Sequence, residues 1–226
     1  MKKVLGGRVD SFPEMSERER LEQQYRAHHE ENRTPDFVFC GPERRKLFAE
    51  LVGGPGKRVL DLGCRTGALT RAYSEGNDVT GVDIDREAMA MAERDLGIRT
   101  VWADVDEPLP FDDGAFDVAV AGELLEHVRH PDALVAEVAR VLAPGGTFVA
   151  STPNAFRLKS RLRFLAGKVP EFADDPTHLR IYHEDMLRDL FRGWTDVRIR
   201  FVAGRLVPLH ARLFANDIVV SARRPG

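Results

Sequence analysis

The sequence predicts an α/β protein built on a doubly wound, mostly parallel seven-stranded sheet with helices on both faces. Short apolar runs alternate with segments of helical periodicity, which is typical of right-handed βαβ units. The first of these runs leads into a glycine-rich turn followed by a helical segment, which marks the ligand-binding edge of such a sheet. The chain has 226 residues, 43% of them hydrophobic and 31% charged, so it can bury a large core and is neither disordered nor collagen-like.

The N-terminal part of the chain differs from the rest. Residues 14–31 are densely charged with few apolar positions, which indicates an exposed helix, and we expect residues 1–42 to form a helical arm or lid. Residues 43–52 place apolar side chains on one helical face, and a glycine-rich stretch then ends the helix. We therefore expect the main domain to span residues 43–226.

The main domain contains the alternating elements of the expected sheet. Strands are expected at residues 58–62, 78–83, 99–103, 116–122, 147–151, 196–202 and 217–222. Helices are expected at residues 68–75, 86–96, 131–142 and 184–191. Residues 106–114 are rich in Pro and Asp and predict a loop or a broken helix. Residues 154–182 interrupt the alternation and predict an insertion on the substrate side.

Charge and cysteine content narrow the class of protein. Lys plus Arg number 33 and Asp plus Glu 36, a net charge of −3 that argues against a dedicated nucleic-acid binder but allows a local basic groove. Two separated cysteines, Cys40 and Cys64, are too few for a disulfide framework or a thiolate zinc site. No apolar stretch approaches the ~20 residues of a membrane span, so we expect a cytoplasmic protein with no transmembrane segment and leave its oligomeric state open.

The glycine-rich turn after the first expected strand indicates the kind of ligand. Asp61 stands two residues before Gly63, Gly67 closes the turn, and neither a dinucleotide-binding fingerprint nor a P-loop is present. An acidic turn repels the phosphates of those ligands and favours a cation. The sulfonium and ammonium groups of S-adenosyl-L-methionine fit, so we expect Asp61, Gly63 and Gly67 to bind this cofactor.

Carboxylates at the ends of the next two strands extend the expected cofactor site. Asp83 lies 22 residues after Asp61, a distance at which such sheets place a carboxylate against ribose hydroxyls. Ile84 follows it and is assigned to the same site. Asp104 can accept a hydrogen bond from the adenine amine, with the Val105 amide near a ring nitrogen.

Six motifs occur in the order seen in class I S-adenosylmethionine-dependent methyltransferases, which the chain resembles over residues 40–224. They are DLGCRTG at 61–67, GVDID at 81–85, AD at 103–104, LPFDDGAFDV at 109–118, LEH at 125–127 and LAPGG at 142–146. The resemblance implies a Rossmann-like fold and a methyltransferase activity. In one departure, Arg65 replaces the family's second glycine, and a positive φ there would strain the backbone by about 1–3 kcal/mol.

The segment after the fourth expected strand carries the candidate catalytic group. Glu123, Glu126 and His127 share one turn, and His127 is the candidate base for an acceptor hydroxyl, or a residue that orients the acceptor. With His178 of the insertion, these residues could ligate a divalent metal (Mg²⁺, Mn²⁺ or Zn²⁺) that lowers the pKa of the acceptor hydroxyl. In the alternative, His178 caps a loop and Glu123 contacts the methionine part of the cofactor.

The subfamily is not decided by these motifs. The Glu-x-x-Glu-His pattern and the later histidine resemble small-RNA 3′-terminal 2′-O-methyltransferases, and also quinone-biosynthesis O-methyltransferases. The insertion resembles a methionine-biosynthesis-associated group as well. Its basic and apolar residues could cover an anionic acceptor, dock on a membrane or form a solvated helix.

Three functions follow from these observations. O-methylation of a small-molecule acceptor is preferred. Metal-assisted 2′-O-methylation of an RNA 3′ end is the first alternative, although the net charge argues against extended RNA binding. The second alternative is a cofactor-binding regulatory module without catalysis.

Overall fold

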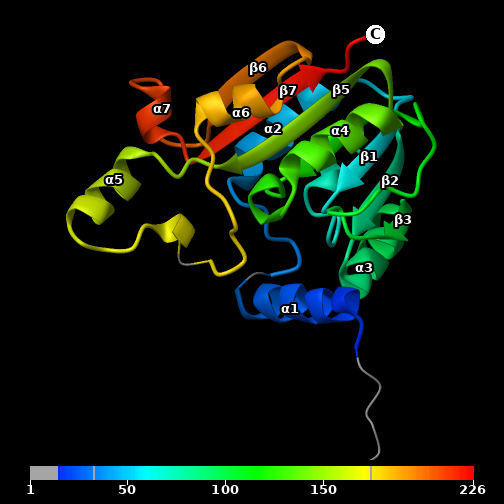
Figure 1. Cartoon of the computed structure of the whole chain (residues 1–226), viewed down its shortest axis with the longest axis horizontal. Helices are drawn as coiled ribbons and strands as arrows, with labels where there is room; N and C mark the ends of the chain where they lie inside the picture. The colour runs from blue at the N-terminus through cyan, green and yellow to red at the C-terminus, as the bar shows by residue number, and fades with distance from the viewer. Residues whose placement is uncertain (1–14, 33, 174) are drawn as a thin grey trace, which may run out of the picture.

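The computed structural model describes residues 15–32, 34–173 and 175–226, and its centre is one seven-stranded sheet (Figure 1). The strand order is β3-β2-β1-β4-β5-β7-β6. The strands are β1 (Arg58–Leu62), β2 (Asp78–Asp83), β3 (Arg99–Trp102), β4 (Phe116–Gly122), β5 (Leu142–Pro153), β6 (Thr195–Val202) and β7 (Asp217–Arg223). The first five are parallel, and β7 runs antiparallel to both β5 and β6, so the expected mostly parallel sheet is confirmed.

Helices cover both faces of the sheet. In the described part they are α1 (Glu17–Asn32), α2 (Gly41–Val52), α3 (Arg86–Leu96), α4 (Pro131–Val141), α5 (Leu158–Leu165), α6 (Glu184–Leu190) and α7 (Ala211–Phe214). Successive residues of β1 point to opposite faces. Val59 packs in the core beneath α2, with Phe48, whereas Leu60 packs in the core beneath α4, with Leu134. All four side chains are buried, as expected for strands covered on both faces.

Local capping explains why the helices begin and end where they do. Asp85 precedes α3, and its Oδ1 accepts hydrogen bonds from the amides of Glu87 and Ala88. Gly97 ends the same helix in the left-handed conformation. These signals lie within a few residues of the helix, so the expected range of 86–96 is confirmed.

The segment after the glycine-rich turn differs from expectation. A helix is expected over residues 68–75, but the structure has only a 3-10 turn, η1 (Thr70–Ala72). The backbone bonds here span three residues, from Ala72 to Leu69 and from Tyr73 to Thr70, and Gly76 adopts a positive φ. The hydroxyl groups of Thr70 and Tyr73 donate to Asp61. The strand expected at 147–151 is also longer, because β5 begins at Leu142.

The two appendages of the sheet both reach the carboxyl ends of its strands. Helix α1 begins with a capping box in which Ser16 and Glu19 exchange hydrogen bonds. Insertion residues 154–182 contain α5 and η3 (Glu171–Ala173), and the amides of Leu179 and Arg180 then donate to the carbonyl of Glu126. The domain division expected at residue 42 stays a prediction, since residues 1–14 and 33 lie outside the described part. No helix among the described residues is long and apolar enough to cross a bilayer.

Candidate functional site

A cavity of about 300 Å³ lies at the carboxyl ends of the first four strands. Its walls come from these strand ends, from α1 and the segment leading to α2, and from Pro176, Thr177 and Leu179 of the insertion. The expected cofactor residues that line it are Asp61, Gly63, Asp83, Ile84, Asp104, Val105 and Glu123. The topology therefore brings together residues from four separate strand ends, as expected for the crevice of a doubly wound sheet.

Gly67 is the expected cofactor residue that does not line this cavity. Its φ is 76°, and a Cβ built on it would lie 2.5 Å from Cδ1 of Leu96 and 3.3 Å from Cβ of Ala92. The glycine therefore allows the turn to pack closely against α3. Gly63, in contrast, lines the cavity, and its amide donates to the carbonyl of Val82 at 2.8 Å.

Asp61 is a buried carboxylate at the floor of the cavity. Its Oδ2 accepts hydrogen bonds from the hydroxyls of Thr70 at 2.5 Å and Tyr73 at 2.8 Å. Burial raises the pKa of Asp61 to about 6, although these two hydrogen bonds act in the opposite direction. A cationic ligand beside it would restore the charged form.

Asp83 organises the turns on both sides of it. Its Oδ1 accepts from the amide of Asp85 at 2.9 Å, and its Oδ2 accepts from the amide of Arg65 at 2.8 Å. Burial raises the pKa of Asp83, and the two backbone hydrogen bonds oppose that rise. Arg65 has a φ of 45°, so the position where the family has glycine does adopt the left-handed conformation. The bond to Asp83 helps to hold this strained residue in place.

The end of β3 completes the cofactor side. Asp104 lines the cavity, and its Oδ1 accepts a hydrogen bond from the amide of Asp106 at 2.9 Å. Trp102 donates from its indole to the carbonyl of Ile84 at 2.8 Å, which joins the tips of β2 and β3. The backbone there is fixed by short local bonds before any ligand binds.

Arg44 also lines the cavity and is not predicted by the sequence analysis. It belongs to α2, only 2% of it is exposed, and it donates to the carbonyl of Phe39 at 3.0 Å. Its guanidinium lies 3.3 Å from Oδ2 of Asp217 and 3.8 Å from Oε1 of Glu123. Burial opposes the charge on Arg44, but these two carboxylates outweigh it and raise its pKa. The signal in the sequence is a cation on the apolar stripe formed with Leu47 and Phe48.

The carboxylate of Glu123 lies beside Arg44 and not with His127 and His178. Its φ is 56°, its amide donates to the carbonyl of Ser151 at 3.1 Å, and the Ser151 hydroxyl donates to its Oε1 at 2.9 Å. The structure thus does not bring Glu123 into the expected group of metal ligands, because these bonds and Arg44 hold its carboxylate elsewhere.

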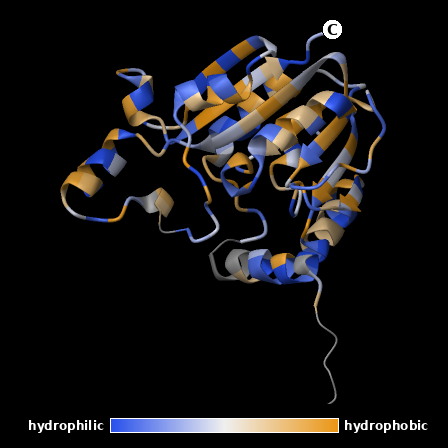
Figure 2. Ribbon diagram, in the orientation of Figure 1, coloured by the Kyte–Doolittle hydropathy of each residue, from blue (hydrophilic) through white to orange (hydrophobic). Residues whose placement is uncertain are grey.

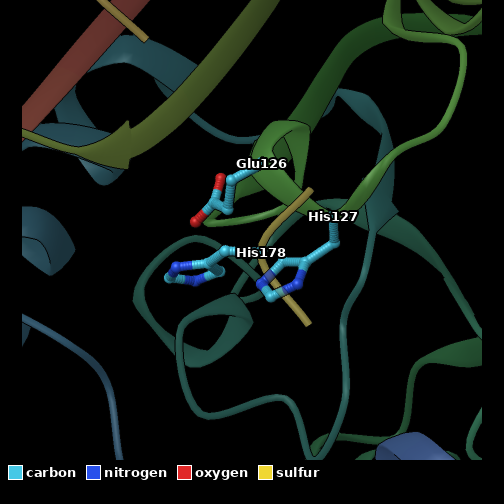
Figure 3. Close-up of side chains that lie close together, drawn as sticks. All are labelled: Glu126, His127 and His178. Atoms are coloured by element: carbon cyan, nitrogen blue, oxygen red, sulfur yellow. The ribbon is translucent and has the colours of Figure 1, made fainter. Parts of the chain in front are cut away.

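Glu126, His127 and His178 do come together (Figure 3). One ligand atom from each lies within 4.8 Å of the others. His127 Nδ1 lies 3.1 Å from the carbonyl of Thr177, and His178 Nδ1 lies 2.8 Å from that of Phe172. A carbonyl only accepts, so each neutral ring donates from Nδ1 and keeps its lone pair on Nε2.

Glu126 is the most unusual member of this cluster. It is 1% exposed, and within the described residues neither of its carboxylate oxygens has a hydrogen-bond partner of good geometry. Burial, and then the charge of Glu123, raise the pKa of Glu126 well above its usual value. A buried carboxylate without a well-formed hydrogen bond, beside two imidazole nitrogens, fits the chemistry of a divalent cation site.

The acceptor end of the cavity is closed by the two appendages. Tyr25 of α1 packs edge to face on His127, with ring centroids 5.9 Å apart. His127 lines the cavity together with Thr177 and Leu179 of the insertion. The insertion therefore returns to the strand ends, which its sequence alone does not require.

Comparison with known proteins agrees with this geometry. A family model described as "Methyltransferase domain" matches residues 36–194, well over half of the chain. A ubiquinone biosynthesis O-methyltransferase from Cronobacter sakazakii is 38% identical over 133 residues, which cover 56% of this chain and 54% of the relative. The chain thus spans about half the length of the curated relatives it matches.

Solved structures share the fold. A SAM-dependent methyltransferase from Archaeoglobus fulgidus aligns with a TM-score of 0.65 and 21% identity over 88% of this chain and 99% of its own. An S-adenosylmethionine-dependent methyltransferase from Mesorhizobium loti aligns with a TM-score of 0.59 and 24% identity over 82% of this chain and all of its own. At these identities the likeness concerns the fold alone.

Proposed function

The chain belongs to the methyltransferase-domain family and has the fold of S-adenosylmethionine-dependent methyltransferases. From this premise we propose that it uses S-adenosylmethionine to methylate an oxygen of a small-molecule acceptor. The observation that carries the proposal is a single cavity that has carboxylates from three strand ends at one side and His127 at the other. Helix α1 roofs that cavity, which favours a small acceptor over a polymer. The relatives named as ubiquinone O-methyltransferases support oxygen as the acceptor atom.

In the proposed complex, each part of the cofactor meets a group of suitable charge. Asp83 accepts hydrogen bonds from the ribose hydroxyls, and Asp104 accepts one from the adenine amine. Asp61 faces the ammonium group. Arg44, the most buried arginine that lines the cavity, binds the carboxylate of the same amino-acid end.

The methyl-transfer step needs few catalytic groups from the protein. The sulfur leaves as a neutral thioether, so no acid is needed for the leaving group. The acceptor hydroxyl must be aligned with the methyl group and must lose its proton. We assign that proton to Nε2 of His127, because the carbonyl of Thr177 holds the opposite side of the ring in the orientation that leaves this atom as acceptor.

The test combines binding with transfer. Calorimetric titration of adenosylhomocysteine should give saturable heat, and labelled methyl should pass from the cofactor to a phenol or alcohol in an acceptor panel. Asp112→Asn, an exposed carboxylate outside the cavity, is the matched control for Asp83→Asn. Cofactor binding without transfer to any acceptor, in the panel or in a broad extract, would favour the cofactor-binding regulatory module instead.

A second candidate function is metal-assisted 2′-O-methylation of an RNA 3′ end, and the cluster of Glu126, His127 and His178 favours it. These residues would hold the ion, with Glu126 as the anionic ligand and the two Nε2 atoms as neutral ones. A bound divalent cation would act as a Lewis acid on the acceptor hydroxyl and lower its pKa. The small roofed cavity and the net charge of −3 weigh against this polymer.

Manganese binding tests whether the cluster holds a metal ion, and a methylation assay on RNA tests whether RNA is the substrate. If a metal is held, titration of Mn²⁺ followed by electron paramagnetic resonance should show one bound ion in the wild type, lost in His178→Ala and kept in the exposed control His130→Ala. RNA methylation should then require a free 2′-hydroxyl at the 3′ end. Full activity on a small acceptor after chelation, in both wild type and His178→Ala, would exclude the metal from the reaction.

A further inference from the structure

A second surface of the protein, apart from the cavity, combines basic and apolar side chains. Residues 155–170 contain no Asp or Glu, although the chain as a whole has a net charge of −3. The same stretch contains five basic residues, namely Arg157, Lys159, Arg161, Arg163 and Lys168. Positive charge is therefore concentrated in one short segment of an acidic protein.

Large apolar side chains are exposed in the same segment. The exposed fraction is 56% for Leu162, 70% for Phe164, 81% for Leu165 and 55% for Val169. They occur on the last turn of α5 and in the turn that follows it, a part of the chain that projects from the sheet (Figures 1 and 2). Residues of these types usually fill cores, so a group of them in solvent marks a surface that meets a partner.

The exposed residues stand on an ordered support. The guanidinium of Arg161 donates to the carbonyl of Phe156 at 2.7 Å, and that of Arg163 donates to the carbonyl of Val169 at 3.0 Å. Backbone bonds from Gly167 to Phe164 and from Lys168 to Arg163 close the turn. Ser160, one turn before Phe164 in the helix, is buried, and α5 packs against α7.

We propose that residues 157–169, here named the basic-apolar tip, dock the protein on an anionic lipid surface. Phe164 and Leu165 enter the boundary between headgroups and acyl chains, and the surrounding Lys and Arg side chains lie against lipid phosphates. Charge complementarity selects this partner. An RNA would satisfy the cations and its bases could stack on Phe164, but it would leave the aliphatic side chains of Leu162 and Leu165 in water. A second copy that met the tip with its own tip would place two basic segments against each other. The proposal stands whatever acceptor the cavity takes.

The experiment is vesicle co-sedimentation of the full-length protein at low and at physiological salt. Vesicles rich in phosphatidylglycerol are compared with vesicles of phosphatidylcholine alone. The variant Phe164→Ser/Leu165→Ser removes the apolar contact, and Lys168→Glu reverses one exposed charge. A matched control, Met186→Ser/Lys57→Glu, changes an exposed apolar residue and an exposed lysine outside the tip. Far-UV circular dichroism checks that every variant folds.

We expect binding to the anionic vesicles and little binding to the neutral ones. The double serine variant should bind at least about tenfold more weakly, because each buried methylene contributes to insertion. Lys168→Glu should bind at least about fivefold more weakly than the wild type at low salt. This difference in affinity should shrink as the salt concentration rises. The control should bind as the wild type does.

Three results would overturn the proposal. The first is no binding to anionic vesicles at low salt, and the second is equal binding by the wild type and the double serine variant. The third is capture of the tip by another partner. RNA binding that survives the serine substitutions would identify a nucleic-acid surface, and a dimer in sedimentation velocity that only the serine variant loses would identify a contact between copies.

Discussion

The two ends of the cavity are built in different ways. The cofactor end comes from three strand tips, and its bonds join residues close to the sheet, such as Asp83 to the amides of Arg65 and Asp85. The acceptor end comes from α1, η2 (Leu125–His127) and the insertion, where His127 meets the carbonyl of Thr177, 50 residues later in the chain. The cofactor end is thus a property of the sheet, whereas the acceptor end depends on appendages that can change without disturbing the fold.

The largest expected effect separates chemistry at the acceptor end from binding at the cofactor end. His127→Ala removes the proposed base, so kcat should fall about a thousandfold, within the range typical of general bases. Affinity for adenosylhomocysteine should stay within about twofold, since the cofactor residues are held by other bonds. Steady-state kinetics and calorimetry on the same preparation measure the two quantities.

His178→Ala sharpens this prediction. If His127 acts alone, His178→Ala should lower kcat by less than about tenfold, because its Nδ1 contact with Phe172 is outside the chemistry. If a metal is involved, both variants should lose activity alike. A His127→Ala enzyme that retains wild-type kcat would remove this residue from the proposed mechanism.

A substitution at the cofactor end should weaken cofactor binding rather than remove a group from the transfer step. Asp83→Asn replaces a carboxylate that accepts two backbone hydrogen bonds and, in the proposed complex, the ribose hydroxyls. Loss of charge-assisted bonds of about 1.5–3 kcal/mol each should weaken adenosylhomocysteine binding about a hundredfold. Asp112→Asn should bind normally. If Asp83→Asn bound the nucleoside as tightly as the wild type, the assignment of the ribose site would be wrong.

Most of the cofactor end could be predicted from the sequence because its signals are local. The cap at Asp85, the glycine after α3 and the acids at the strand ends all lie beside the elements they define. Gly67 shows the limit of that approach. A motif glycine can face either a ligand or a neighbouring helix, and only the packing against Leu96 shows which.

The acceptor end depends on contacts that no local pattern contains. The grouping of His127 with His178 could be proposed from residue types, but the return of the insertion rests on the bonds from Leu179 and Arg180 to Glu126. Glu123 was expected beside these histidines from its spacing. Ser151 and Arg44 hold it away, and their positions follow from strand pairing and helix packing rather than from the turn itself.

A pH titration of cofactor binding tests the role of Asp61 at the cofactor end. Burial raises its pKa from 3.8 to about 6, and a cofactor ammonium group needs the carboxylate form. Affinity should therefore fall as the pH drops through 6, to about a tenth of its pH 7 value near pH 5. The contribution of Asp61 to the stability of the cofactor-free protein has the opposite pH dependence. It is greatest below pH 3.8 and is lost as the pH rises through about 6, because the folded state holds the proton more tightly.

Asp61→Asn is the control for that titration. Its affinity should be lower at pH 7 but nearly constant between pH 5 and pH 7. Calorimetry in buffers of different ionisation enthalpy should also show proton release on binding near pH 6 for the wild type alone. An unchanged pH slope in Asp61→Asn would assign the titration to another group, such as Asp83, whose pKa is also raised by burial.

The smallest expected effect concerns the ion pairs that hold α1 over the cavity. Glu22 is buried and pairs with Arg86 at 2.7 Å and Arg26 at 2.9 Å, which joins α1 to the first turn of α3. Glu22→Gln weakens these pairs, so α1 should open more often and the cofactor should dissociate about threefold faster. The free energy of unfolding should change by less than about 1 kcal/mol, because both arginine partners are partly exposed and α1 can open without unfolding the sheet. Stopped-flow dissociation and urea denaturation measure the two effects, with Arg20→Gln, which removes one exposed charge from the same helix, as the control. A large loss of stability with unchanged dissociation would mean that α1 belongs to the core of the fold and is not a separable cover of the acceptor end.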